Sequence, residues 1–264
     1  MSTTTERTRN QGDLWGTRPH DWAEQEERQL PTYEEAMRRV GSHAAGDVLD
    51  VGCGAGTFLR LAAERGAGVA GLDASAALIG LARDRVPDAD LHVGEMESLP
   101  FGDARFDLVT GFNSFFFASD MDAALVEAAR VARPGGIVLV QVWGRPERCE
   151  VMPLIAAARE LVASAEARPS PGPQAWERGV LEGRLERAGL HPADAFDLSY
   201  PFEYPDDEAL LRSMLAAGGV AEVVRAAGAE RTADAILAAA EPNRASDGSY
   251  RLANEWHFAT GRKP

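Results

Sequence analysis

Five short apolar segments alternate with helical stretches between residues 47 and 143. The apolar segments are Val48–Val51, Val69–Asp73, Leu91–Val93, Phe106–Thr110 and Ile137–Val142. The intervening stretches carry helix signals, such as Ser75 ahead of apolar residues at helical spacing. Strands that alternate with helices pair in parallel and are covered by helices on both faces. We therefore predict an α/β fold with a doubly wound, mostly parallel sheet.

The flanking regions lack this strict alternation. Residues 1–45 are predicted to form a helical lid segment, with disorder up to about residue 11 and a capping box of Thr32 and Glu35 for a helix ending at Val40. Residues 146–264 are expected to add a helix over about 151–165, a loop at Pro169–Pro173, two strands and a helical insert over 206–240. Together with a binding core at 46–145, these segments predict a single domain over 1–264.

Composition limits the class of partner. The 264 residues contain 27 Lys and Arg against 41 Asp and Glu, a formal net charge of −14. Nucleic acids and anionic membranes attract basic surfaces, so we expect neither as a partner and favour a small molecule. Two cysteines cannot form a disulfide framework, and neither a signal peptide nor an apolar span is apparent. We expect a cytoplasmic protein and leave a homodimer open.

The segment Asp50–Gly56 combines three closely spaced glycines with an aspartate, directly between a strand and a helix. Glycines let the backbone turn tightly and approach a ligand closely. A dinucleotide fingerprint needs a third glycine at the position of Thr57, so the spacing argues against NAD. An aspartate two residues before Gly52 suits an ammonium group better than a pyrophosphate. An amino-acid-containing cofactor is therefore favoured.

This segment resembles the first motif of the class I S-adenosylmethionine-dependent methyltransferases. The resemblance continues in order through Gly71–Asp73, Gly94–Phe101, Phe106–Val109 and Arg130–Gly136, and it spans residues 47 to 143. It is closest to the small-molecule branch that includes ubiquinone and menaquinone biosynthesis enzymes. The family implies a seven-stranded Rossmann-like sheet whose last strand is antiparallel, with S-adenosyl-L-methionine as the cofactor.

The resemblance also implies a set of cofactor-binding positions. They are Asp50, Gly52, Cys53, Gly54 and Gly56 for the methionine part, Asp73 for the ribose hydroxyls, Ala74, Glu95 and Met96 for the adenine, and Phe112 and Asn113 near the methyl group. Simpler roles are open for several of them: Asp73 could cap the next helix, Met96 could be core, and Cys53 is expected to pack rather than react.

The acceptor side of the site is predicted less directly. An activated methyl group needs alignment above all, and a base only if the acceptor must lose a proton. Among five histidines, His20 is the leading candidate for a base because it lies in the aromatic N-terminal segment. Trp22, Phe116 and Trp143 are expected to line an apolar substrate pocket, and at least one of Phe115–Phe117 must be core. No metal site is expected.

Three functions fit these observations to different degrees. The first is methyl transfer to a small, largely apolar metabolite at oxygen, nitrogen or carbon. The second keeps the cofactor without methyl transfer, as in a cyclase, a decarboxylase or a non-catalytic regulator. The third, a nicotinamide oxidoreductase, is opposed by Asp50 and Thr57.

Overall fold

The fold is built on one seven-stranded sheet. A computed structural model describes residues 5–162, 177 and 179–264. In spatial order the strands are β3 (Asp90–Val93), β2 (Gly68–Asp73), β1 (Asp47–Val51), β4 (Phe106–Phe112), β5 (Ala132–Trp143), β7 (Tyr250–Arg262) and β6 (His191–Tyr204). Only β7 is antiparallel, to β5 on one side and β6 on the other. This order confirms the predicted doubly wound, mostly parallel sheet with an antiparallel last strand.

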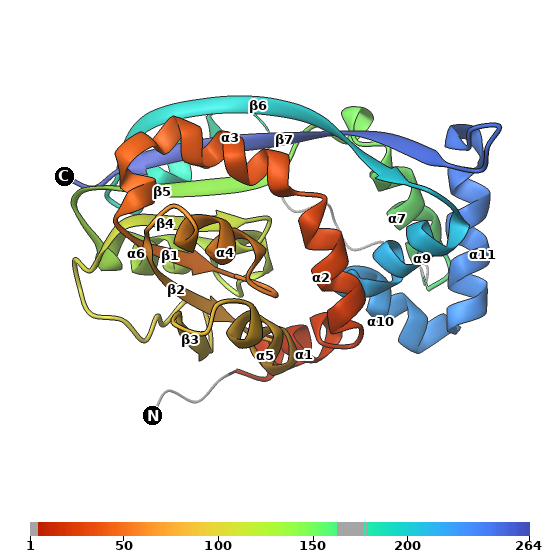
Figure 1. Cartoon of the computed structure of the whole chain (residues 1–264), viewed down its shortest axis with the longest axis horizontal. Coiled ribbons are helices and arrows are strands. Elements are labelled where there is room, and N and C mark those ends of the chain that lie inside the picture. The colour runs from red at the N-terminus through yellow and green to blue at the C-terminus, as the bar shows by residue number, and fades with distance from the viewer. Residues whose placement is uncertain (1–4, 163–176, 178) are drawn as a thin grey trace.

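Helices cover both faces of this sheet (Figure 1). Alternate residues of a strand point to opposite faces, and β1 shows this directly. Val48 packs with α3 (Leu30–Val40) and α4 (Thr57–Ala63), whereas Leu49 packs with α6 (Met121–Val131) and α8 (Val180–Arg187). A smaller cluster lies between α4, α5 (Ala76–Arg85) and the β2–β3 edge. As predicted, the Ser75 hydroxyl caps α5 by accepting from the Leu78 amide.

The last two strands continue past the other strands into a group of helices. Figure 1 shows the ends of β6 and β7 beside this group. Its members are α7 (Val151–Glu160), α9 (Asp207–Ala216), α10 (Gly218–Ala227) and α11 (Ala229–Ala240). Four alternating side chains of β7, Tyr250, Leu252, Trp256 and Phe258, are each no more than 2% exposed. The end of the helix predicted over 151–165 and the Pro169–Pro173 loop lie outside the described residues.

The N-terminal segment differs from two sequence predictions. Helix α1 (Glu6–Trp15) begins well before residue 11, with the Thr5 side chain accepting from the Thr8 amide at 3.3 Å. The Thr32–Glu35 capping box is also wrong. Helix α3 already begins at Leu30, so the Thr32 hydroxyl lies within its first turn and donates to the Gln29 carbonyl at 2.7 Å. Pro31 explains the earlier start, because proline is well tolerated in a first helical turn.

Helix α2 (Pro19–Glu27) connects α1 to α3 and brings the N-terminal segment across the end of the sheet. It contacts α9 on one side and α5 on the other, while α1 contacts α10. Within the described ranges 5–162 and 179–264, no helix has the length and apolarity that crossing a bilayer requires. The N-terminal helices thus pack directly against the 206–240 helices above the strand ends.

Candidate active site

A cavity of about 870 Å³ lies at the carboxyl ends of the strands. Ligands of open α/β sheets bind at this edge, where the strand order reverses. Here the reversal falls between β1 and β4, and residues following both strands line the cavity. Helices α1, α2, α7, α9 and α10 supply the opposite wall. The topology thus brings the glycine loop and the N-terminal helices to one enclosed space.

The glycine loop needs its glycines for backbone and steric reasons. Gly52 and Gly54 have φ angles of +79° and +54°, in the left-handed region that glycine adopts without strain. A Cβ atom on Gly52 would collide with the Ser114 side chain. A Cβ atom on Gly54 would collide with the Glu26 carboxylate and lie 3.3 Å from the Trp22 indole nitrogen. The loop is therefore a close-fitting floor of the cavity.

Asp73, at the end of β2, ties this loop to the start of α5. Its Oδ2 accepts from the Gly54 amide at 2.9 Å and its Oδ1 from the Ser75 amide at 2.8 Å. Burial raises the pKa of the Asp73 carboxyl, although these backbone hydrogen bonds partly oppose the rise. Since a carboxylate oxygen accepts more than one hydrogen bond, Asp73 retains acceptor capacity toward the cavity that it lines.

Glu26 of α2 is a site residue that the sequence reasoning missed. Only 4% of this residue is exposed, and its carboxylate reaches into the glycine loop. It accepts from the Ala55 amide at 2.8 Å and from the Thr57 hydroxyl at 3.0 Å, with Arg85 at 3.7 Å. Burial is the main reason that the pKa of Glu26 rises to about 7. The helical segment around Glu26 looks like an ordinary charged surface in sequence, and only its packing reveals the role.

Asp50 completes an acidic cluster with Glu26 and Asp73. Asp50 is 3% exposed and accepts from the Thr110 hydroxyl at 2.7 Å. Burial, with smaller contributions from the charges of Glu26 and Asp73, raises the pKa of Asp50 to about 7. Three carboxyl groups of raised pKa around one loop favour a ligand that brings positive charge. The structure thus adds two carboxyl groups to the argument made from Asp50 in the sequence, and the role of Asp50 stays a prediction.

Most of the predicted site residues come together around the cavity. Those that line it are Asp50, Gly52, Cys53, Gly54, Asp73, Ala74, Met96, Phe112 and Asn113 on the predicted cofactor side, and Trp22, Phe116 and Trp143 on the predicted substrate side. Cys53 is buried, and burial raises the pKa of its thiol, in keeping with the expected packing role.

Three predicted residues lie outside the cavity lining. Gly56 is behind the loop, where a Cβ atom would lie 3.1 Å from Ala82 Cβ. The Glu95 carboxylate accepts from the Thr5 amide, and its neighbour Glu97 lines the cavity instead. His20 is exposed on the first turn of α2. Their proposed roles remain predictions, and the structure gives Glu97 the position nearer the cavity.

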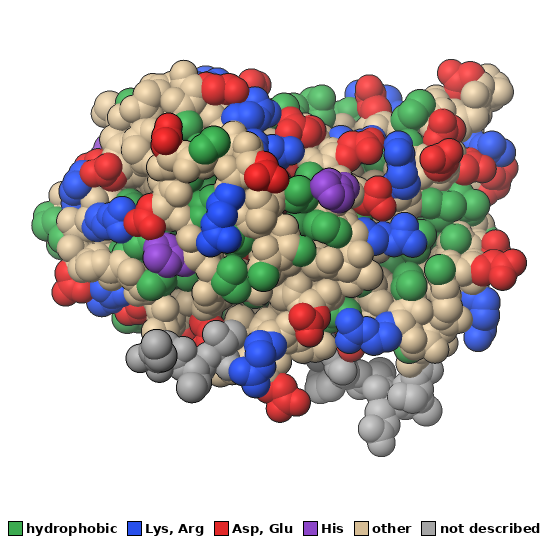
Figure 2. Space-filling model, turned by 60° about the horizontal axis from the view of Figure 1, so that its bottom comes forward, with side chains coloured by type: hydrophobic (Ala, Val, Ile, Leu, Met, Phe, Trp, Pro, Cys, Tyr) green, Lys and Arg blue, Asp and Glu red, His purple; other side chains and the backbone are tan. Residues whose placement is uncertain are grey.

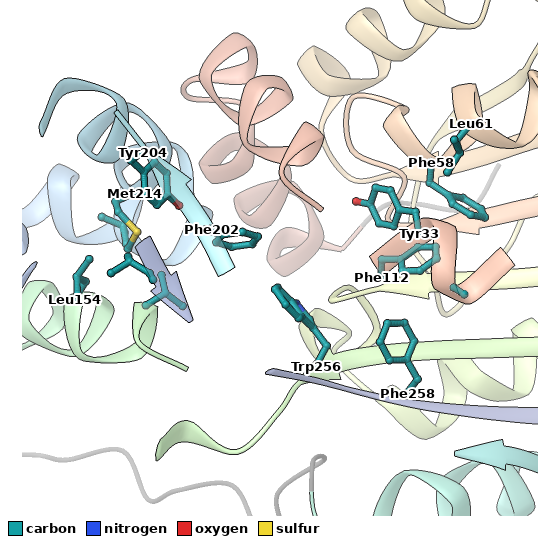
Figure 3. Close-up of a cluster of buried hydrophobic side chains, with 14 of the residues drawn as sticks. Tyr33, Phe58, Leu61, Phe112, Leu154, Phe202, Tyr204, Met214, Trp256 and Phe258 are labelled. Carbon is teal, nitrogen blue, oxygen red and sulfur yellow. The ribbon is translucent and has the colours of Figure 1, made fainter. Parts of the chain in front are cut away.

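Aromatic side chains from distant segments line the cavity, and Figure 3 shows three of them, Tyr33, Phe112 and Phe202. Tyr33 and Phe112 lie with ring centroids 4.6 Å apart, and Phe202 lies 6.2 Å from Trp143. Trp143 in turn stacks on Trp256 at 5.5 Å. Phe202 comes from β6 and Tyr33 from α3, so neither was expected at the site. Phe202 reaches the cavity because β6 pairs with β7 along its length, and Tyr33 reaches it because the N-terminal helices pack over the strand ends.

Aromatic contacts also close the N-terminal helices over the cavity. Trp15 packs edge-on against Trp22 at 4.4 Å and against Phe117 at 5.4 Å. Phe115 is fully buried, which confirms that one of the three consecutive phenylalanines is core. A Cβ atom on Gly218 would lie 2.6 Å from the Trp15 ring, so α10 fits closely against α1. Among the residues that the structure describes, no cluster of three or more His, Cys, Asp or Glu forms a metal site.

Comparison with known proteins identifies the central part of the chain. Residues 49–140 match the family model of a methyltransferase domain. A malonyl-[acyl-carrier protein] O-methyltransferase from Serratia marcescens is 39% identical over 106 residues, 40% of this chain and 42% of that protein. A dTDP-3-amino-3,6-dideoxy-alpha-D-glucopyranose N,N-dimethyltransferase from Streptomyces fradiae is 39% identical over 116 residues, 42% of this chain and 45% of that protein. The chain thus spans less than half the length of these relatives.

Structural similarity to known proteins covers more of the chain than sequence similarity does. The crystal structure of the YcgJ protein from Bacillus subtilis superimposes with a TM-score of 0.60, covering 89% of this chain and 98% of that one. Sequence identity there is 21%, so this match supports the fold alone. The family model matches from within β1 to within β5 and therefore includes the glycine loop and Asp73.

Proposed function

We propose that this chain, whose residues 49–140 match a methyltransferase domain, transfers a methyl group from S-adenosyl-L-methionine to a small, largely apolar metabolite. The acidic cluster of Glu26, Asp50 and Asp73 at the glycine loop carries this proposal. The cofactor has an ammonium and a sulfonium group against one carboxylate. Its net positive charge complements buried carboxyl groups that a pyrophosphate would repel.

The residues present fit this cofactor from end to end. Gly52 and Gly54 line the cavity; because neither has a Cβ atom, Ser114 and Glu26 pack tightly against the loop, and the loop backbone would lie beside the methionine part. Asp73 would accept hydrogen bonds from the ribose hydroxyls, and Ala74 and Met96 would flank the adenine. When bound, the cofactor supplies an activated methyl group on sulfur. The protein's contribution is then to align the acceptor and to exclude water.

The other half of the cavity would hold the acceptor. Trp143, Phe116 and Phe112 give it apolar surface next to the predicted position of the methyl group. Alignment between two bound reactants alone contributes on the order of 7–11 kcal/mol in favourable cases. We therefore assign the rate enhancement chiefly to positioning, with His20 retained as the candidate base if the acceptor must lose a proton. The accepting atom is an oxygen, a nitrogen or a carbon.

An Asp73→Asn variant tests the cofactor assignment. The change keeps the size of the side chain but removes the charge and one hydrogen-bond acceptor. We expect the Kd for S-adenosylhomocysteine, measured by calorimetry, to rise about 5- to 150-fold, which corresponds to about 1–3 kcal/mol. Asp90→Asn makes the same change on neighbouring β3, outside the cavity lining, and should leave Kd unchanged. Unchanged affinity in Asp73→Asn would contradict the proposed cofactor site.

A cofactor-binding protein without methyl transfer is the second candidate. It is favoured by one observation: none of the five histidines, all of which are described, lines the cavity. Incubation with methyl-labelled cofactor and candidate acceptors separates the two functions. Labelled product supports methyl transfer, whereas tight cofactor binding without any labelled product from the whole panel supports the second candidate.

The partner and location follow the same reasoning. We propose a small-molecule substrate and a cytoplasmic protein, without a nucleic-acid or membrane partner. On the face shown in Figure 2, basic side chains are interspersed with acidic ones rather than gathered into one patch. This mixing and the net charge of −14 both support the small-molecule proposal.

A further inference from the structure

The cavity wall opposite the glycine loop carries an arginine without an acidic partner. Arg159, in the last turn of α7, lines the cavity together with Met152 and Ile155, which lie on the same face of that helix. Its guanidinium group forms no ion pair or hydrogen bond with any residue that the structure describes. Arg184, which also lines the cavity, differs because it bonds to Asp122 at 2.6 Å. Arg159 is therefore available to a ligand.

The start of α10 lies beside this arginine. Helix α10 contacts both α7 and α9 (Figure 1), and a Cβ atom on Gly219 would lie 3.0 Å from a guanidinium nitrogen of Arg159. Ala217 precedes the helix and has no side chain that could cap it. The amides of Gly218 and Gly219 donate to no described residue, whereas the Val220 amide donates to the Ala217 carbonyl at 2.9 Å. Unpaired amides at the positive end of a helix dipole favour a negatively charged group.

Gln25 of α2 adds a buried donor next to these helices. Gln25 is 6% exposed and lines the cavity, and its Oε1 accepts from the hydroxyl groups of Tyr204 and Ser213. Ser213 lies on α9, one helical turn before Ala217, so Gln25 is held close to the start of α10. The Gln25 Nε2 donates to no described residue and is not among the unpaired atoms that are closed off from the cavity. An unpaired buried donor costs free energy, so an acceptor in the cavity is expected.

The two sides of the cavity therefore have opposite character. The glycine loop carries the acidic cluster of Glu26, Asp50 and Asp73, which suits the positively charged cofactor. The opposite wall offers hydrogen-bond donors and one positive charge, from Gln25, Arg159 and the start of α10. A carboxylate or a phosphate matches this wall, because each accepts several hydrogen bonds and pairs with the planar guanidinium group.

We infer that Arg159, Gln25 and the start of α10 bind an anionic group of the methyl acceptor, either a carboxylate or a phosphate. This inference rests on the proposed function, because it assigns one end of the acceptor that the cofactor would methylate. The apolar part of the acceptor then packs against Trp143 and Phe202, which line the same cavity. The wall keeps the anionic end away from the acidic cluster, so the charge of the acceptor sets its orientation.

Three compounds with the same aromatic ring test the anion site. Binding of 1-naphthoate, 1-naphthyl phosphate and the uncharged 1-naphthamide to the full chain is measured by equilibrium dialysis with saturating S-adenosylhomocysteine. We expect at least one anion to bind about fivefold or more tightly than the amide. The factor is modest because Arg159 is exposed to water, which weakens ion pairs. The tighter of the two anions identifies the group as a carboxylate or a phosphate.

Three variants and one control assign this preference to the wall. Arg159→Gln should reduce the preference for the anion to less than about twofold, with the Kd for S-adenosylhomocysteine unchanged, and Arg159→Lys should retain part of it because it keeps the charge. Gln25→Met removes the buried donor and should lower the preference at least about twofold. Arg225→Gln removes the same charge from an exposed position of α10 outside the cavity lining and should keep the full preference.

Four results would overturn the inference. They are anions that bind no more tightly than the amide, no detectable binding of any of the three compounds, a preference that survives in Arg159→Gln or in Gln25→Met, and an equal loss of preference in Arg225→Gln and Arg159→Gln. Failure of the unmodified protein to bind S-adenosylhomocysteine would instead contradict the proposed function itself. The two failures are therefore distinguishable.

Discussion

Replacing Glu26 with glutamine should stabilise the ligand-free protein in a pH-dependent way. Glu26 is 4% exposed, and its pKa rises from 4.5 to about 7 mainly through burial. The native state therefore holds a proton on Glu26 between pH 4.5 and 7 that the unfolded chain has released. Stability falls as the pH rises through this window, because the folded protein must then bury the charge.

The size of the effect follows from the shift in pKa. A shift of one unit corresponds to 1.36 kcal/mol, so ionised Glu26 lowers the free energy of unfolding by about 3 kcal/mol above pH 7. Glutamine resembles the protonated acid, since its carbonyl still accepts from the Ala55 amide that Glu26 binds at 2.8 Å. We expect a gain of up to about 3 kcal/mol at pH 8 and a gain of about 1 kcal/mol or less at pH 5. For a chain of this length, 3 kcal/mol corresponds to about 5 °C in Tm.

Thermal unfolding at pH 5 and pH 8 measures this difference. Glu24→Gln is the matched control, because Glu24 lies on the same helix but is half-exposed and bonded to Arg28 at 3.4 Å. That variant should change stability by less than about 1 kcal/mol at either pH. A Tm of Glu26→Gln that equals or falls below the unmodified value at pH 8, or an equal gain at both pH values, would refute the reasoning.

Three further predictions concern the loop, the cofactor and the lid. Gly54→Ala should lower the free energy of unfolding, measured by denaturant titration, by more than Gly66→Ala does. Both residues have positive φ, but only a Cβ atom on Gly54 collides with Glu26. Equal losses in the two variants would contradict this packing. The affinity for S-adenosyl-L-methionine should rise by up to about tenfold per pH unit between pH 6 and 7. A cationic ligand favours the ionised forms of Glu26 and Asp50, whose pKa values are about 7. An unchanged affinity over this range, measured by calorimetry, would count against binding of the cofactor by the acidic cluster. Gly218→Ala should push α10 away from the Trp15 ring and speed proteolysis within α1. Gly183→Ala on α8, where a Cβ atom would make only an ordinary 3.7 Å contact with the end of Arg187, should not; equal rates would contradict a lid held by the Gly218–Trp15 contact.

The sequence predicted the core of the fold because that core repeats a local pattern. The first five strands lie where the apolar segments place them, and α5 begins directly after the predicted helix signal at Ser75. The glycine loop and Asp73 were predictable for the same reason, since strand, turn and cap are encoded within a few residues. The family resemblance added the order of the motifs.

The remainder of the site depends on contacts between distant segments. Glu26 meets Ala55 and Thr57 across about thirty residues, and Phe202 reaches the cavity only through the β6–β7 pair. No local pattern marks these residues as different from surface or core. Glu95 is the opposite case. Its position in a motif predicts a contact with the adenine, but in the structure its side chain accepts a hydrogen bond from the Thr5 amide. The roles of these residues depend on their burial and on their hydrogen-bond partners, which cannot be predicted from the neighbouring residues in the sequence.

A crystal structure with S-adenosylhomocysteine tests the central claim most directly. We predict that the ribose hydroxyls bond to Asp73, that the amino-acid end lies on Gly52 and Gly54 near Glu26, and that the sulfur faces the aromatic half of the cavity. Density for the nucleoside elsewhere on the protein, or the absence of any bound nucleoside at saturating concentration, would contradict the account.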